Sequence, residues 1–273
     1  MIEAMSGPVV TFLTDYGLSD PFVGVCHGVI AQRCPQARII DLSHGIPPQD
    51  VRAGAVALAR ALPFMPVGVM LGVVDPGVGG ARRGVAIRAA AGHQLVGPDN
   101  GLLWPAALAA GGVEAAVDLA ESRFVLDPVS ATFHGRDVFA PVAAALAAGA
   151  ALEEAGSPID PASLVALDPL VPVVETDALR ARVVAIDRFG NLELAATSAD
   201  LHAAGIAGRD GVVVEAGDRR IDAHTGRTFS DIATGELLLY EDSSRVLSLA
   251  VSSGSAARRL AVATGDELRI SAL

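Results

Sequence analysis

The first half of this chain alternates continuously apolar runs with segments in which apolar residues recur at helical spacing. The apolar runs predict buried strands at residues 9–13, 38–42, 67–74, 85–89 and 94–96. The helical patterns predict helices at residues 22–33, 51–62, 102–110 and 137–148. This alternation of strand and helix predicts an α/β sandwich domain with a largely parallel sheet and helices on both of its faces.

The pattern changes near Gly149. Proline and glycine recur through residues 151–178 and predict a linker without regular elements. Strand signals follow at residues 182–186, 192–195, 212–215, 236–240, 246–251 and 267–270. Their close spacing predicts a small antiparallel barrel or sandwich. We therefore expect an α/β domain over residues 1–150, a linker over 151–178 and a smaller all-β domain over 179–273.

Composition narrows the class of protein. The 273 residues are 51% apolar and 19% charged, which is typical of a globular chain with a sizeable core. The formal net charge of −11 argues against nucleic acid or an anionic membrane as a partner. All 20 basic residues are arginine, so Schiff-base and Walker-type lysine mechanisms are excluded.

The cysteines and the N-terminus predict a compartment. Cys26 and Cys34 have no zinc-type spacing with histidine and are too few for a disulfide framework, so we expect a cytoplasmic protein. Residues 1–8 have neither the basic region nor the apolar core of a signal sequence. The uncharged run at 138–152 is shorter than the roughly 20 residues of a membrane span.

Acidic residues follow or end three of the predicted strands, at Asp15, Asp41 and Asp75. Ligands of open α/β sheets bind outside the carboxyl ends of the strands, so these acids stand where a site is expected. An acid at Asp15 can accept both hydroxyls of a ribose. Asp20 has two interpretations, a second substrate contact or the N-cap of the helix that begins with Pro21 at its first position.

The segment from Val73 to Arg83 turns on three glycines between an acid, Asp75, and two arginines, Arg82 and Arg83. Glycines let backbone and ligand approach closely, so the segment can form a site. It can equally be a glycine-rich turn that Asp75 caps. A phosphate loop is a weak match, because the lysine and the full glycine spacing are missing.

Three further segments each have a functional and a purely structural interpretation. His134, at the entrance of the helix predicted from 137, is either a proton-handling group or a satisfied loop histidine. Asp187, Phe189 and Asn191 either form a hairpin turn or read the edge of a base. The run Ser243, Ser244 and Arg245 is either a turn or a clamp for a carboxylate, since arginine binds carboxylates in a bidentate way.

Five motifs in order along the chain resemble the S-adenosylmethionine (SAM) hydrolases, or SAM hydroxide adenosyltransferases, which are homologous to the SAM-dependent fluorinase and chlorinase. They are T-D-Y-G at 14–17, D-P-G-V-G-x-x-R-R at 75–83, G-P-D-N-G at 97–101, T-F-H-G-R-D at 132–137 and D-R-F-G-N at 187–191. The resemblance implies an N-terminal α/β domain, a C-terminal β-barrel and a site between the subunits of a homotrimer. It implies attack of water on the 5′ carbon of SAM, with SAM as substrate and no cofactor.

The resemblance also implies residue roles. Asp75, Arg82 and His134 match the catalytic triad, with Arg82 rather than Arg83 as the partner of Asp75. The matched substrate-binding positions are Asp15, Asp20, Asp187, Phe189, Asn191, Ser243, Ser244, Arg245 and Val251.

Two positions separate hydrolysis from halogenation within this resemblance. The halogenating branch has tyrosines where this chain has Asp75 and His134, so hydroxide is the expected nucleophile. Gly135 matches a serine in the fluorinase and a glycine in the chlorinase and does not decide. Relatives often have glutamate at Ser248 and asparagine near Ser252 and Ser253, so contacts to adenine can differ here.

Three alternatives remain open at this point. The first is a chlorinase-like halogenase. The second is a metal-dependent phosphohydrolase with Asp15, Asp41, His44 and Asp75 as ligands, although the arginines near Asp75 oppose a cation. The third is a non-catalytic sensor of adenosine or SAM.

Overall fold

The computed structural model describes residues 7–273, and the predicted absence of a signal sequence concerns a segment that begins outside them. The chain divides into two compact units, one ending at Leu167 and the other spanning Asp168–Leu273. None of the helices within residues 7–273 is long and apolar enough to cross a membrane. Cys26 and Cys34 are both buried free thiols.

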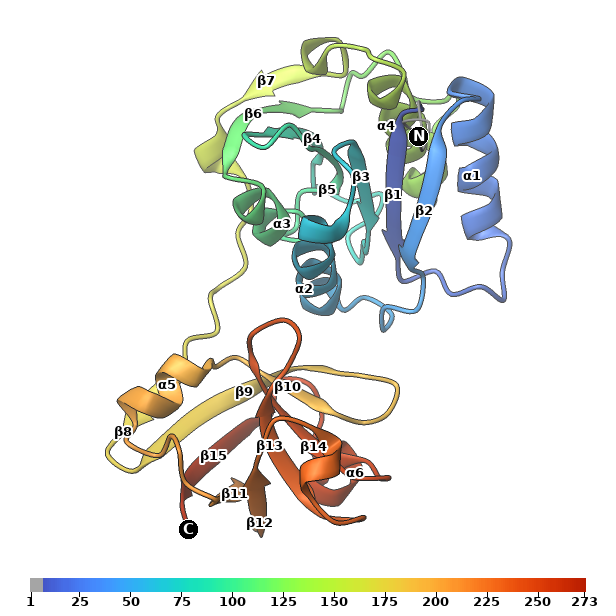
Figure 1. Ribbon diagram of the computed structural model, residues 1–273. Helices are drawn as coiled ribbons and strands as arrows, with labels where there is room; N and C mark the ends of the chain where they lie inside the picture. Colours follow the sequence, from blue (N-terminus) through green and yellow to red (C-terminus); the bar gives the residue numbers. More distant parts are fainter. Residues whose placement is uncertain (1–6) are drawn as a thin grey trace, which may run out of the picture. The chain divides into compact units, whose positions relative to one another are not determined.

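The first unit is built on a seven-stranded mixed sheet with strand order β2-β1-β3-β5-β4-β6-β7 (Figure 1). Its strands are β1 (Val9–Thr14), β2 (Arg38–Ser43), β3 (Val69–Val73), β4 (Gly84–Ala89), β5 (Gln94–Pro98), β6 (Val113–Asp118) and β7 (Ser157–Ile159). The four strands β2, β1, β3 and β5 are parallel, whereas β4, β6 and β7 pair antiparallel. The predicted α/β class is confirmed, with β1, β2 and β3 as the first strands of the parallel half and β5 joining them after the antiparallel β4.

Helices cover both faces of this sheet. They are α1 (Phe22–Arg33), α2 (Val51–Ala61), η1 (Leu62–Phe64), α3 (Trp104–Ala109), the π-helix η2 (Gly135–Phe139), α4 (Ala140–Ala147), η3 (Leu152–Glu154) and η4 (Pro161–Ser163). One apolar cluster joins α1 and α4 to the sheet through Ile30, Phe12 and Val142. A second cluster joins α2 and α3 to the opposite face through Leu58 and Leu102. The sheet is therefore a buried central layer, which explains its continuously apolar strands.

The second unit is a closed barrel of seven strands with an eighth strand at its edge (Figure 1). Its elements are β8 (Val173–Glu175), β9 (Ala178–Ile186), β10 (Leu192–Leu194), α5 (Ser198–Ala203), β11 (Gly211–Ala216), β12 (Arg219–Thr225), η5 (Phe229–Asp231), β13 (Leu237–Glu241), β14 (Leu247–Val251), α6 (Ala256–Leu260) and β15 (Glu267–Ala272). The ring closes because β10 pairs with both β14 and β9. The predicted barrel is confirmed, although one pair, β12 with β13, is parallel.

The segment predicted to be a linker without regular elements contains short ones. β7 adds to the first sheet beside β6, and β8 pairs with β9 in the second unit. Proline occurs in β7, at Pro158, because β7 is the last strand of its sheet and needs to pair on one side only. Each of these strands has three residues, too few for a periodic signal in the sequence.

Candidate functional site

A pocket of about 690 Å³ opens in the first unit, lined by residues that follow the carboxyl ends of β1 and β3. Strand order reverses between these strands, since β1 is followed along the chain by β2 on one side and then by β3 on the other. Ligands of open α/β sheets bind at such a switch point. The lining residues are Asp15, Tyr16, Phe22, Pro48, Gln49, Asp75, Pro76, Val78, Ser130, Thr132, Phe133, His134, Gly135 and Arg136.

Asp75, Arg82 and His134 form one hydrogen-bonded group. Arg82 donates from Nε to Oδ1 of Asp75 at 2.8 Å and from Nη2 to Oδ2 of the same carboxylate. The Nη2 of Arg82 also lies 2.9 Å from Nδ1 of His134. Asp75 and His134 line the pocket, whereas Arg82 contacts both of them and its guanidinium lies over the ring of Phe139. The prediction that Arg82 is the partner of Asp75 is confirmed by this geometry.

Arg83 belongs to a different group. Its Nε donates to Oδ2 of Asp99 at 3.0 Å, and its Nη2 donates to the backbone oxygen of Ser163 at 2.7 Å. The other oxygen of Asp99 accepts from the backbone nitrogen of Val165. Arg83 thus ties the start of β4 to the end of η4, and it does not line the pocket.

The loop after β3 approaches the loop before η2 at Gly79. Gly79 has a φ of +74°, and a Cβ there would overlap the backbone oxygen of Ala131. Both the left-handed backbone and the close approach require glycine. The glycines of this segment therefore bring Asp75 next to the 130–134 loop that ends in His134.

His134 precedes the π-helix η2, which continues into α4. Single π-helical turns are uncommon and are often found at functional sites. Burial, and then the positive charge of Arg82, lower the pKa of His134, while Asp75 and Asp137 oppose this shift. His134 is therefore neutral near pH 7.

Asp137 supports the same loop from within the protein. Its side chain is 1% exposed, and it accepts from the backbone nitrogen of Ser130 at 2.8 Å and from Nε of Arg136. Burial alone would raise the pKa of this carboxyl, but the hydrogen bonds from Arg136 and Ser130 hold it below its ordinary value. Asp137 therefore remains an anion that fixes the loop in front of His134.

Asp15 lies in the pocket wall, as predicted from its position after the first strand. Its Oδ2 accepts from the backbone nitrogen of Gln49 at 2.8 Å. Gln49 has a φ of 66°, a left-handed conformation that is uncommon for residues other than glycine. Gln49 and Pro48 reach the pocket from the loop before α2, and no sequence signal marked them.

Three aromatic residues form one wall of the pocket, and none of them was predicted as a site residue from the sequence. Tyr16, Phe22 and Phe133 contact one another edge to face, with ring centroids 5.2 to 5.8 Å apart. Burial is the main cause that raises the pKa of Tyr16, so its hydroxyl stays protonated. Tyr16 follows Asp15 and Phe133 precedes His134 within two of the quoted motifs. These neighbouring positions were the signal in the sequence that could have placed both rings in the pocket.

Asp20 does not cap the helix that follows it. The N-cap of α1 is Pro21 rather than Asp20, and it has no side-chain cap, so the capping interpretation was wrong. The helix instead opens with a backbone bond from Val25 to the oxygen of Pro21. Asp20 is exposed and is not among the residues that line the pocket.

In the second unit, a pocket of about 730 Å³ brings together Asp187, Phe189, Asn191 and Val251. Asp187 accepts from the backbone nitrogens of Phe189 and Asn191 and from Nδ2 of Asn191 at 2.7 Å. Because Nδ2 is held by Asp187, the carboxamide oxygen is the atom of Asn191 that can accept from a ligand. Phe189 is 67% exposed and offers a stacking face.

The predicted run Ser243, Ser244 and Arg245 lies in the turn between β13 and β14. Asp242 organises this turn by accepting from the backbone nitrogen of Ser244 and from Oγ of Ser248. The side chain of Arg245 is 88% exposed and donates to Glu241. Ser243 and Arg245 line a separate hollow, not the pocket that contains Asn191.

The three acids and one histidine considered as metal ligands do not meet in one place. Asp75 is paired with Arg82 and Asp15 with the backbone of Gln49. Asp41 and His44 do come together, but with His27, and neither lines the pocket. The arrangement gives no support to a phosphohydrolase built on those four residues.

Comparisons with known proteins match nearly the whole chain. The model of the SAM hydroxide adenosyltransferase N-terminal domain matches residues 10–156, and that of the C-terminal domain of the same family matches residues 181–269. An (R)-S-adenosyl-L-methionine hydrolase of Salinispora arenicola is 49% identical over 267 residues, covering 98% of this chain and 99% of the relative. A fluorinase of an Actinoplanes species is 28% identical over 282 residues, covering 91% and 92%.

A solved structure has the same fold. The crystal structure of an uncharacterized conserved protein from Thermotoga maritima superposes with a TM-score of 0.88 at 36% identity. The match covers 96% of this chain and 99% of that one.

Proposed function

This chain belongs to the SAM hydroxide adenosyltransferase family, and we propose that it hydrolyses S-adenosyl-L-methionine to adenosine and L-methionine at the pocket that contains Asp75 and His134. The observation that carries the proposal is the group of Asp75, Arg82 and His134, which offers a carboxylate, a guanidinium and a neutral imidazole beside one another. The pocket volume lies within the roughly 300–1,000 Å³ common for small-molecule sites.

The reaction needs one proton acceptor and no general acid. The oxygen of a water molecule forms a bond to the 5′ carbon of SAM, and the bond from that carbon to sulfur breaks with its electron pair remaining on sulfur. The sulfonium thereby becomes the neutral thioether of methionine. The water must lose one proton, and the residue that accepts it passes it on to solvent.

The hydrogen bond from Arg82 to His134 supports Asp75 as the proton acceptor. A guanidinium can only donate, so Nδ1 of His134 accepts from Arg82 and the proton of the neutral imidazole is on Nε2. An Nε2–H group can hold the water oxygen but cannot take its proton. Each oxygen of Asp75 accepts one bond from Arg82 and retains a further lone pair. We therefore assign the proton to Asp75 and the orientation of the water to His134.

Arg82 acts through its neighbours. It does not line the pocket, and it fixes both Asp75 and the tautomer of His134. The positive charge of Arg82 also stabilises the negative charge that develops on the oxygen of the attacking water. Arg82 is in this sense a positioning residue.

The substrate contacts are part of the same proposal. Asp15 would accept hydroxyls of the ribose, and Asn191, held by Asp187, would accept from the amino group of adenine. Phe189 and Val251 would contact the base, and Ser243, Ser244 and Arg245 would bind the methionine carboxylate. Asp20 remains a predicted contact without a place in the described pocket.

A chlorinase-like halogenase is the second candidate, favoured by the similarity to a fluorinase. One experiment separates the two. Purified protein is incubated with SAM in ¹⁸O-labelled water, with and without excess chloride, and the products are separated by chromatography. We expect label in the 5′-hydroxyl of adenosine in both samples. Formation of 5′-chloro-5′-deoxyadenosine would favour the halogenase, and SAM recovered unchanged would contradict both.

The finer expectations belong to this proposal as well. A homotrimer, a cytoplasmic location and a reaction without a cofactor follow from the resemblance and from the content of cysteine. Analytical ultracentrifugation and retention of full activity after exhaustive chelation test the first and the last of these.

A further inference from the structure

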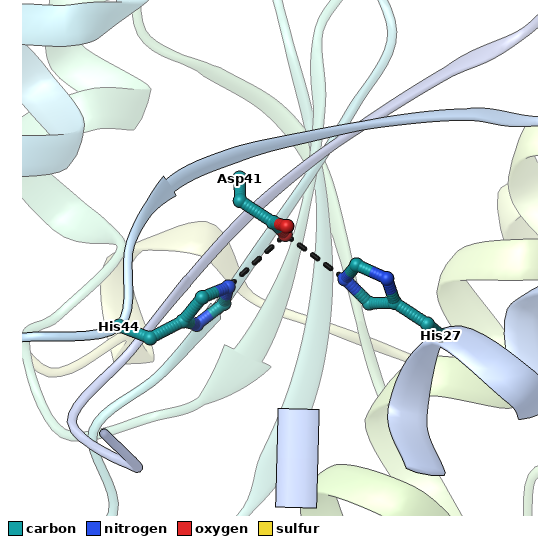
Figure 2. Close-up of side chains that lie close together, drawn as sticks. All are labelled: His27, Asp41 and His44. Atoms are coloured by element: carbon teal, nitrogen blue, oxygen red, sulfur yellow. Dashed lines mark hydrogen bonds and ion pairs between the residues drawn. The ribbon is translucent and has the colours of Figure 1, made fainter. Parts of the chain in front are cut away.

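Three side chains of metal-binding type from separate segments of the first unit lie close together, and none of them lines the pocket that contains Asp75 and His134 (Figure 2). Asp41 comes from β2, His44 from the loop that follows it and His27 from α1. The Nε2 of His27 lies 2.9 Å from Oδ1 of Asp41, and the Nε2 of His44 lies 3.0 Å from the same oxygen. The potential ligand atoms all lie within 4.8 Å of one another.

The Nε2 atoms of His27 and His44 differ in their hydrogen bonding. His27 forms a hydrogen bond with Asp41. The side chain of His44 is 3% exposed, and its Nε2 is buried without a hydrogen-bond partner among the described residues, despite its distance of 3.0 Å from Asp41. A buried imidazole nitrogen seldom stays unsatisfied in a folded protein. Figure 2 shows Nε2 of His44 pointing to the carboxylate of Asp41, which lies at ion-pair distance but forms no hydrogen bond with this nitrogen.

The other nitrogen of His44 is already engaged. Its Nδ1 lies 2.9 Å from Oγ1 of Thr14. Metal-binding histidines commonly use their second nitrogen in this way, which fixes the ring and leaves one nitrogen for the ion. The contact with Thr14 therefore prepares Nε2 of His44 as a ligand.

We propose that His27, Asp41 and His44 bind a divalent transition-metal cation of the zinc class. Two imidazoles and one carboxylate suit zinc, whereas magnesium and calcium prefer oxygen ligands. A cation would accept a lone pair from Nε2 of His44 and would replace the close approach of this atom to Asp41 by coordination. His27 and Asp41 are 33% and 42% exposed in their side chains, so an ion and a completing water have access from solvent.

The cation would brace a loop that borders the pocket. The backbone oxygen of His44 accepts from the nitrogen of Gly17 at 2.7 Å, and Thr14 accepts from the nitrogen of Tyr16. These bonds flank Asp15. The site is nevertheless distinct from the proposed reaction, because His27, Asp41 and His44 do not line the pocket. Its existence does not depend on the proposed function.

Calorimetric titration of the full chain with Zn²⁺ tests the proposal. The protein is prepared without a polyhistidine tag and is freed of metal with a chelator before the titration. We expect one equivalent to bind the wild type at neutral pH and His27→Gln to weaken binding at least ~10-fold, the lower end for disturbed metal shells. His27 is chosen because its side chain is partly exposed whereas that of His44 is buried, so its replacement should not unfold the protein.

A matched control separates this site from general histidine binding. His224 is another half-exposed histidine beside a carboxylate, with Nε2 3.3 Å from Glu236. His224→Gln should bind Zn²⁺ like the wild type, and at the same Zn²⁺ concentration the melting temperature of both should rise more than that of His27→Gln. Absence of stoichiometric binding by the wild type would overturn the proposal, as would equal affinity in His27→Gln or saturable binding of Mg²⁺ at the same groups.

Discussion

A side chain at position 135 would overlap the hydroxyl of Tyr16, so Gly135 and Tyr16 occupy one space at the edge of the pocket. Tyr16 has little room to move, because Phe22 and Phe133 contact its ring at centroid distances of 5.8 Å. Glycine at 135 is therefore required by the close approach of Tyr16.

Gly135→Ala should destabilise the protein by about 1–3 kcal/mol, the usual cost of overpacking. Tyr16→Phe removes the hydroxyl that Cβ would meet, and the ring carbon beyond it is 3.1 Å from the Cβ position. We expect the double variant to recover most of the loss. Urea unfolding of the four proteins measures the coupling. Strictly additive effects would show that Tyr16 is not what excludes a side chain at 135.

Asp75→Asn and His134→Ala should each lower the turnover of SAM at least ~100-fold, the usual scale for loss of a proton-handling group. The amide introduced by the first change cannot accept the proton of the water, and the methyl group left by the second cannot hold the water oxygen. Release of adenosine, followed by chromatography, gives the rates. Asp118→Asn, which changes a carboxylate at the end of β6 outside the pocket, is the control. Wild-type turnover in either active-site variant would contradict the role proposed for that residue.

The adjacent arginines should separate activity from stability. Arg82→Gln removes the contacts to Asp75 and His134, so we expect turnover to fall at least ~10²-fold, as when a preorganised donor is removed. Arg83→Gln removes the bonds to Asp99 and Ser163 and should lower the free energy of unfolding by about 1–3 kcal/mol with little effect on turnover. Turnover and urea unfolding are measured on both. Equal loss of activity in the two variants would contradict the separate roles.

The free energy of unfolding and kcat/KM should both depend on pH through the lowered pKa of His134. Burial and Arg82 keep the folded-state pKa below the ordinary 6.5, so the unfolded chain binds this proton first as the pH falls. The stabilising contribution of neutral His134 is complete above pH 6.5 and is lost as the pH falls through the folded pKa. The acid limb of kcat/KM should accordingly lie below pH 6.5.

NMR titration of the His134 ring measures this pKa directly. Arg82 lowers the pKa of His134 and Asp75 raises it. In Arg82→Gln only the effect of Asp75 remains, so the titration midpoint of His134 should be higher than in the wild type. A wild-type midpoint above 6.5 would contradict the neutral imidazole on which the assignment of Asp75 as proton acceptor depends.

Two helical glycines should respond oppositely to alanine. A Cβ at Gly24 in α1 meets nothing within 4 Å, so Gly24→Ala should stabilise the protein by about 0.5–1 kcal/mol. A Cβ at Gly54 in α2 would lie 2.8 Å from Leu102 and 3.0 Å from Val74, so Gly54→Ala should destabilise it by about 1–3 kcal/mol. Thermal and urea unfolding compare the pair. A gain in stability in Gly54→Ala would show that α2 shifts freely against Leu102 and Val74.

Much of the fold was predictable because long elements bury one continuous face. Helix α1 was predicted with its observed bounds, and β1 to β5 within two residues, since apolar runs and helical spacing are local properties of the sequence. β6 and β12 were missed, because their alternation is interrupted by polar and small residues. The short strands β7 and β8 lie in a proline-rich segment and exist through pairing with distant strands.

The sequence by itself determined the α/β class of the first unit, the all-β class of the second and the identity of Asp75, Arg82 and His134 as candidates, because ordered motifs and periodicity are local properties of the chain. Only the tertiary structure decided which groups touch. It paired Arg82 with Asp75 and His134, gave Arg83 to Asp99, placed Tyr16 against Gly135 and joined His27 to Asp41 and His44. Such contacts depend on strand order and on close packing between segments far apart in the chain, and neither is encoded in local spacing.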